Sequence, residues 1–126
     1  MAKFDDSLVA VTSRSFSTNQ FLVKKLKESS PNVSLNLTGT TLKENELVKF
    51  LANAEKAIVG IEIIDKDILD QLPKLKLISK YGVGLNNLDL GECKKRNIQI
   101  KFQPGSNKQS VAEFTILLML NSLRQV

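Results

Sequence analysis

The alternation of short apolar segments with helical segments restricts the fold of this chain more than any other feature of its sequence. The apolar segments cover residues 8–12, 33–37, 57–60, 75–79 and 98–102. The first of them, Leu8-Val-Ala-Val-Thr12, is a continuous run rich in β-branched residues, which is typical of a strand buried on both faces. Strands that alternate with helices form parallel sheets that helices cover on both faces.

Local signals predict where the intervening helices begin and end. A Ser or Thr followed three residues later by Glu or Gln is typical of a helix start, and this spacing begins at Ser17, Thr41 and Ser110. Asp65 is placed to cap another helix, and Asn97 suits a left-handed helix C-terminus. The five strand–helix units predict an α/β fold, a flavodoxin-like, doubly wound parallel sheet of five strands in the order 2-1-3-4-5. Ligands of such a sheet bind outside the carboxyl ends of its strands.

Composition and charge exclude several classes of protein. The 126 residues are 42% hydrophobic and 25% charged, which fits one globular domain. The net charge of +5 comes from dispersed lysines without interleaved aromatic residues, so we expect no nucleic-acid partner. A single cysteine and the lack of histidine argue against a disulfide or a metal site and favour the cytoplasm. No apolar run reaches the length of a membrane span, and no signal peptide is evident.

A glycine-containing loop is the strongest candidate for a binding site. The stretch Lys80-Tyr-Gly-Val-Gly-Leu-Asn-Asn-Leu-Asp89 follows the predicted strand 75–79 and precedes a predicted helix over 90–97. Two glycines in three residues allow the backbone to approach a ligand closely and to present its N–H groups. We therefore predict that the loop holds a carboxylate. The alternative is a strand-to-helix turn that needs glycine only for a positive φ.

The last predicted helix, residues 110–126, has almost no polar face. A helix that is apolar on all sides needs burial on all sides, whereas one sheet covers only one side. Two explanations stay open: the helix packs against another subunit, or the chain belongs to a larger protein. Its apolar residues are Val111, Ala112, Phe114, Ile116, Leu117, Leu118, Met119, Leu120 and Leu123.

Three motifs, in this order and at this spacing, resemble one family. It is the family of NAD-dependent D-isomer-specific 2-hydroxyacid dehydrogenases, which includes phosphoglycerate dehydrogenase. The resemblance is strongest over residues 73–124. The motifs are Leu75-Lys-Leu-Ile-Ser-Lys-Tyr-Gly-Val-Gly-Leu-Asn-Asn-Leu-Asp89, Arg96-Asn-Ile-Gln-Ile100 and Pro104-Gly-Ser-Asn-Lys-Gln-Ser-Val-Ala-Glu-Phe114.

The resemblance implies that substrate binding and catalysis are shared between two domains. Family members join a flavodoxin-like substrate domain to a Rossmann domain that carries Gly-x-Gly-x-x-Gly and the catalytic Arg, Glu and His. This sequence contains neither that motif nor a histidine. Residues 1–109 then correspond to the substrate domain, and residues 110–126 to a linker helix near the subunit interface. We expect no catalytic residue in this chain, NAD or NADP only in the full-length parent, no turnover by the chain alone, and a homo-oligomer formed through residues 110–126.

The resemblance also assigns roles to individual residues. Val83 and Gly84 would offer backbone N–H groups to the carboxylate of a small 2-hydroxyacid or 2-ketoacid. Tyr81 would flank the pocket, although a half-buried packing role also fits it. Asn107 would face the cleft, and its alternative is a turn residue that stabilises its own backbone. Val111 would lie near the nicotinamide.

Two acidic residues lie near the predicted site, and neither is expected to be catalytic. Glu113 fits the capping box that begins at Ser110 better than the role of a catalytic acid. Glu62 follows the third strand, where phosphoglycerate-specific family members tend to carry arginines. There it would repel a phosphate, which argues against phosphoglycerate as the substrate.

A second hypothesis is a free-standing flavodoxin-like module that binds a small molecule or a flavin, or that signals. The hydroxyl-rich segment Thr12-Ser-Arg-Ser-Phe-Ser-Thr18 lies where a flavodoxin would bind phosphate. The segment lacks a glycine, however, and the chain has no tryptophan to stack on a flavin. Flavin absorbance of the purified protein would favour this hypothesis.

Overall fold

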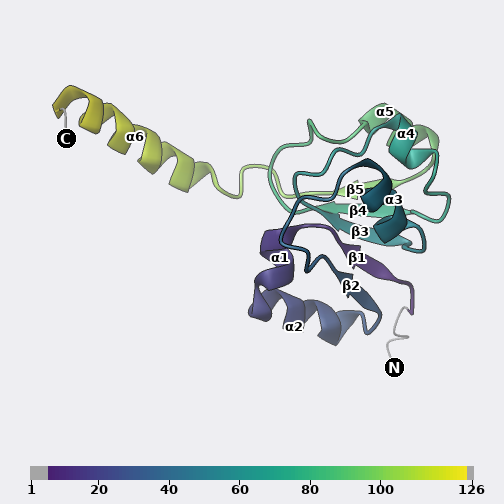
Figure 1. Cartoon of the computed structure of the whole chain (residues 1–126). Helices are drawn as coiled ribbons and strands as arrows, with labels where there is room; N and C mark the ends of the chain where they lie inside the picture. The colour runs from purple at the N-terminus through teal and green to yellow at the C-terminus, as the bar shows by residue number, and fades with distance from the viewer. Residues whose placement is uncertain (1–5, 125–126) are drawn as a thin grey trace.

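The computed structural model describes residues 6–124 and contains one parallel sheet (Figure 1). The strand order is β2-β1-β3-β4-β5, so the predicted flavodoxin-like order 2-1-3-4-5 is confirmed. Each strand lies within or beside an apolar segment of the sequence and is three or four residues long. The strands are β1 (Val9–Val11), β2 (Val33–Leu35), β3 (Lys56–Val59), β4 (Leu77–Lys80) and β5 (Gln99–Lys101).

Helices lie on both sides of this sheet. On one side α3, α4 and α5 contact one another in turn, while α1 and α2 pack together on the other side (Figure 1). The core lies between the sheet and the first of these groups. It joins Ile78 of β4 to Leu47 and Leu51 of α3 and to Leu69 of α4, all of them buried. The helices are α1 (Arg14–Thr18), α2 (Gln20–Ser29), α3 (Glu44–Leu51), α4 (Lys66–Leu69), α5 (Leu90–Lys95) and α6 (Lys108–Arg124).

The helix starts agree with the sequence only in part. Asp65 caps α4 through a hydrogen bond from the Ile68 N–H at 3.0 Å, as predicted. Asn97 has a φ of 56°, which confirms its left-handed conformation. Thr41 does not cap α3, because that helix begins at Glu44 and its N-cap residue, Lys43, makes no side-chain cap bond.

The predicted start at Ser17 is also wrong. Ser17 lies inside α1, is buried, and donates its hydroxyl to the carbonyl of Val11 at 3.5 Å. The second helix, α2, is capped by Asn19 instead, which accepts a hydrogen bond from the Leu22 N–H at 3.1 Å. Asparagine is at least as good an N-cap residue as serine, so the chain breaks into two helices at Asn19.

Helix α6 begins at Lys108, two residues before the predicted start at Ser110. Ser110 is therefore helical and does not act as the N-cap. Glu113 accepts a hydrogen bond from Gln109 Nε2 at 2.7 Å, so its structural role is an i,i+4 pair and not half of a capping box. The predicted helix extended to residue 126, and residues 125–126 lie outside the described part of the chain.

Helix α6 extends away from the sheet, beyond the loop that follows β5 (Figure 1). Its large apolar side chains are 50–79% exposed. Within residues 6–124, no helix combines the length and the hydropathy that a membrane crossing needs. The exposed side chains are Val111, Phe114, Ile116, Leu117, Leu118, Met119, Leu120 and Leu123.

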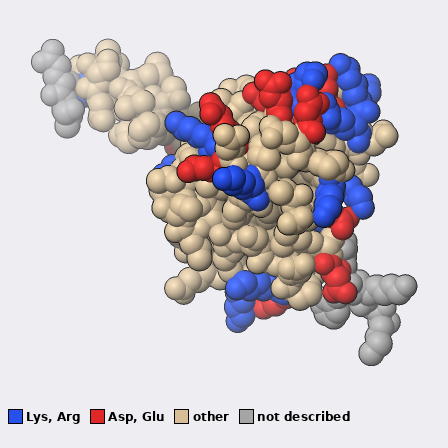
Figure 2. All heavy atoms as spheres, turned by 45° about the vertical axis from the view of Figure 1, so that its right-hand side comes forward, with Lys and Arg blue, Asp and Glu red and all other residues tan. Residues whose placement is uncertain are grey.

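Basic and acidic side chains are interspersed on the face shown in Figure 2. A dense group lies over α4 and α5, where Asp70 pairs with Arg96 and, at 2.6 Å, with Lys66. The hydrogen bonds from Lys66 and Arg96 hold the pKa of the Asp70 carboxyl below its ordinary value. Because charges of both signs meet here, this face carries no extended basic patch.

Candidate functional site

The loops after β4 and β5 border an open hollow of about 370 Å³ at the carboxyl edge of the sheet. The structure thus brings together Tyr81, Val83 and Asn107, three of the residues that the sequence predicts to bind substrate. Gly84 follows Val83 in the same loop but does not line the hollow. Val111 lies in α6 with its side chain exposed, outside the hollow. The residues that line it are Lys80, Tyr81, Gly82, Val83, Gln103, Ser106 and Asn107.

The backbone of this loop presents N–H groups that the rest of the domain does not use. The Tyr81 N–H still pairs with the sheet, donating to the Val59 carbonyl at 2.8 Å. None of residues 6–124 accepts a hydrogen bond from the N–H groups of Gly82, Val83 or Gly84. Consecutive unpaired N–H groups beside a concave surface suit an anion such as a carboxylate. Gly82 has a φ of 147°, a conformation that favours glycine. The alternative interpretation, a turn that needs glycine for its positive φ, therefore also fits this loop.

Lys80 and Asn87 tie this loop to the loop that follows β3. The Lys80 ammonium donates to the Gly60 carbonyl and, at 2.7 Å, to Asn87 Oδ1. Asn87 Nδ2 donates to the carbonyls of Gly60, at 3.2 Å, and Glu62, at 2.6 Å. Burial lowers the pKa of the Lys80 ammonium from its ordinary value, and the Glu62 carboxylate opposes that shift.

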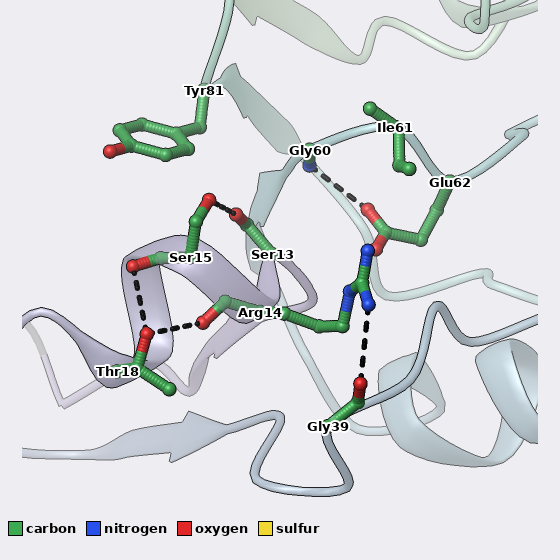
Figure 3. Close-up of a pocket in the computed structure, with 9 residues that line it drawn as sticks. All are labelled: Ser13, Arg14, Ser15, Thr18, Gly39, Gly60, Ile61, Glu62 and Tyr81. Atoms are coloured by element: carbon green, nitrogen blue, oxygen red, sulfur yellow. Dashed lines mark hydrogen bonds between the residues drawn. The ribbon is translucent and has the colours of Figure 1, made fainter.

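Glu62 is buried, although it lies in the loop that follows β3. The residue is only 2% exposed, and its carboxylate accepts a hydrogen bond from Thr12 Oγ1 at 2.8 Å. It accepts a second one from the Gly60 N–H at 2.9 Å (Figure 3). These bonds join the end of β1 to the end of β3. The sequence identified neither this buried role nor the Lys80–Asn87 pair.

A second hollow, of about 470 Å³, lies beside the first at the ends of β1 and β3 (Figure 3). Tyr81 lines both hollows and is 41% exposed. Its ring also packs edge-on against Phe16, with 5.3 Å between the ring centroids. Both roles considered for Tyr81, packing and flanking a pocket, are therefore compatible with its position. The second hollow is lined by Ser13, Arg14, Ser15, Thr18, Gly39, Gly60, Ile61, Glu62 and Tyr81.

The hydroxyl-rich segment 12–18 gives no support to the flavodoxin-like alternative. The Thr12 hydroxyl donates to Glu62, and the buried Ser17 hydroxyl donates to Val11. Ser13 accepts a hydrogen bond from the Phe16 N–H as the cap of α1. These three hydroxyl groups therefore make hydrogen bonds within the domain itself.

The parallel sheet and its strand order define a flavodoxin-like domain, and the glycine loop at its carboxyl edge is a candidate ligand site. The family model described as "D-isomer specific 2-hydroxyacid dehydrogenase, catalytic domain" matches residues 9–119. The chain belongs to this family.

One relative in sequence and two solved structures are similar to this chain. A hydroxypyruvate reductase of Thermotoga maritima is 31% identical over 93 residues, which cover 73% of this chain and 30% of that protein. The TT0316 protein of Thermus thermophilus has a TM-score of 0.77 at 28% identity, over 90% of this chain and 36% of that one. An NAD+-bound 3-phosphoglycerate dehydrogenase of Entamoeba histolytica has a TM-score of 0.76 at 24% identity, over 93% of this chain and 39% of that one. This chain thus spans about a third of the length of these proteins.

Proposed function

We propose that this chain is the substrate-binding part of an NAD- or NADP-dependent dehydrogenase that interconverts D-2-hydroxyacids and 2-ketoacids. The observation that carries the proposal is the hollow at the end of β4, where Val83 lies beside unpaired backbone N–H groups. In our proposal the N–H groups of Val83 and Gly84 hold the substrate carboxylate, while Tyr81 and Asn107 border it. Family membership supports this interpretation.

We further propose that residues 1–109 act together with a separate coenzyme domain, which residues 110–126 connect to them. Val111, which we propose lies near the nicotinamide, has an exposed side chain in α6, and the sequence given has no Gly-x-Gly-x-x-Gly loop. The coenzyme, when bound by that domain, supplies hydride transfer at C2 of the acid. The part of this chain is to fix the carboxylate, which orients C2. Because the chain also lacks a histidine, we expect the isolated chain to bind acids without turnover.

Titration with a small acid, followed by NMR of the ¹⁵N-labelled chain, tests the carboxylate site. We expect glycolate to shift the amide signals of Val83 and Gly84, with a Kd on the order of 1 mM because a two-carbon acid makes few contacts. Glycolamide has nearly the same size without the charge and serves as the control. Shifts located elsewhere, or equal shifts with glycolamide, would contradict the proposal.

We also propose that the substrate is a small acid without a phosphate and that the protein works in the cytoplasm. The Glu62 carboxylate lines the hollow beside the carboxylate site and opposes a second anionic group there. D-glycerate should therefore bind at least as well as its 3-phosphate in the same NMR titration. Tighter binding of the phosphorylated acid would argue for a role of Arg14, which lines the same hollow.

Self-association through helix α6 is the expected consequence of its exposed apolar side chains. An apolar surface of this extent is unusual on a monomer. We expect a dimer or a larger oligomer by light scattering, and a monomer after the double substitution Leu117→Lys with Leu120→Lys. Thr115→Lys, on the same helix, is the matched control and should leave the oligomer intact. A monomeric wild-type chain at high concentration would refute the prediction.

A further inference from the structure

Lys80 is the last residue of β4, and its side chain folds back beneath the glycine loop instead of extending into solvent. Its ammonium donates to Gly60 and Asn87. A Cβ atom placed on Gly82 would lie 3.4 Å from Lys80 Cε and 4.0 Å from Lys80 Nζ. The lysine side chain therefore passes directly against the backbone of Gly82. Holding an ammonium group in such a partly buried place is unfavourable unless the surroundings use its charge or its hydrogen bonds.

The bonds of this ammonium group define where the loop sits. The Gly60 carbonyl accepts from both Lys80 and Asn87, so one oxygen after β3 anchors both ends of the loop after β4. Between these ends, the described residues form no hydrogen bond with the N–H groups of Gly82, Val83 and Gly84. The segment from Gly82 to Gly84 is thus held from its flanks, by the bonds of Lys80 and Asn87 and by Leu85, which packs against the hydrophobic core.

Lys80 also borders the hollow. Lysine carries three N–H donors, and Gly60 and Asn87 account for two of them. Lys80 is one of the residues that line the hollow together with Val83. Its ammonium therefore lies close to the segment with the unpaired N–H groups, and one of its three donors has no acceptor among the described residues.

We propose that Lys80 is a positioning residue of the carboxylate site, which holds the Gly82–Gly84 segment over the ends of β3 and β4 and adds a positive charge beneath it. This inference rests on the proposed role of the Val83 and Gly84 N–H groups. It adds to that role a side chain that the glycine motif alone does not identify. Asn87 is the partner that keeps the ammonium in place.

Glycolate titrations of lysine variants test this inference. Lys80→Met keeps the length of the side chain and removes the charge. We expect it to weaken glycolate binding by about ten- to a hundredfold, because hydrogen bonds to charged groups are the strong ones. Lys80→Arg should retain most of the affinity. Lys76→Met is the matched control, since Lys76 precedes the other end of β4 and pairs with Glu55 at 2.6 Å, and it should change the affinity less than about twofold.

A measurement on the wild-type chain covers the case in which Lys80→Met does not fold. Glycolate should shift the side-chain Hε and Cε signals of Lys80 and leave those of Lys76 unchanged. If wild type binds glycolate at Val83 and Gly84 but Lys80→Met binds equally well, or the Lys80 signals do not move, the inference about Lys80 is wrong and the carboxylate site stands. If wild type does not bind glycolate, the proposed function and the inference both fail.

Discussion

Replacing Ile64 with alanine is expected to lower the free energy of unfolding by about 2–5 kcal/mol. Ile64 is fully buried and belongs to the hydrophobic core. Its backbone also joins two loops: its N–H donates to the Asn87 carbonyl, and its carbonyl accepts from the Asp89 N–H, both at 2.9 Å. Main-chain bonds on both sides of this side chain limit how far the surroundings can close around the smaller residue, so we expect a cavity.

Urea denaturation followed by circular dichroism measures this effect. The midpoint should fall while the dependence on urea stays the same, because the surface exposed on unfolding changes little. Ile63→Ala is the matched control: the neighbouring side chain is 66% exposed, and its removal should cost less than about 0.5 kcal/mol. Equal losses for the two variants would show that Ile64 does not support the core as the structure indicates.

The arrangement of the sheet was predictable because burial leaves a clear pattern in the sequence. Strands such as β1 and β4 lie among apolar residues whose side chains the structure buries, for example Ala10 and Ile78. Once strands alternate with helices, the handedness of the crossover connections leaves few possible strand orders. Because the strand order was predicted from all five strands together, a wrong helix start at a single residue did not change it.

Helix starts were less predictable because a four-residue spacing can be satisfied by competing groups. The prediction held at Asp65, where the flanking Ile64 and Leu69 are both buried and fix the entry of the chain into α4. It failed at Ser17, where Asn19 two residues later provides a competing cap. It failed at Ser110 because α6 simply extends one half-turn further toward its N-terminus.

The candidate site was predicted only at residues that belong to two short motifs, the glycine loop and the segment around Asn107. The glycine motif indicated Tyr81 and Val83, which indeed line one hollow. The polar contacts that join this loop to the loop after β3 connect residues 20 or more positions apart, as in the bonds of Lys80 with Gly60 and of Asn87 with Glu62. No local pattern reveals such partners. The one available signal was a lysine at the end of a strand that begins with the apolar residues Leu77 and Ile78.

Gly82→Ala is expected to weaken glycolate binding by about tenfold or more and to lower the free energy of unfolding by about 1–3 kcal/mol. The φ of 147° at Gly82 is rarely adopted by a residue with a side chain. The added Cβ would also lie 3.4 Å from Lys80 Cε, so the loop has little room to keep its position. Relief of the strain would rotate the backbone and move the N–H groups of Val83 and Gly84.

The same NMR titration and urea denaturation measure both effects, and Gly91→Ala is the matched control. Gly91 lies in α5, and a Cβ there would meet Asp89 Oδ1 at an ordinary 3.6 Å. Alanine in a helix is favoured over glycine, so this control should raise the free energy of unfolding by up to about 1 kcal/mol and leave glycolate binding unchanged. If Gly82→Ala binds glycolate like wild type, the carboxylate does not depend on the backbone conformation of this loop, and the site must lie elsewhere on the carboxyl edge of the sheet.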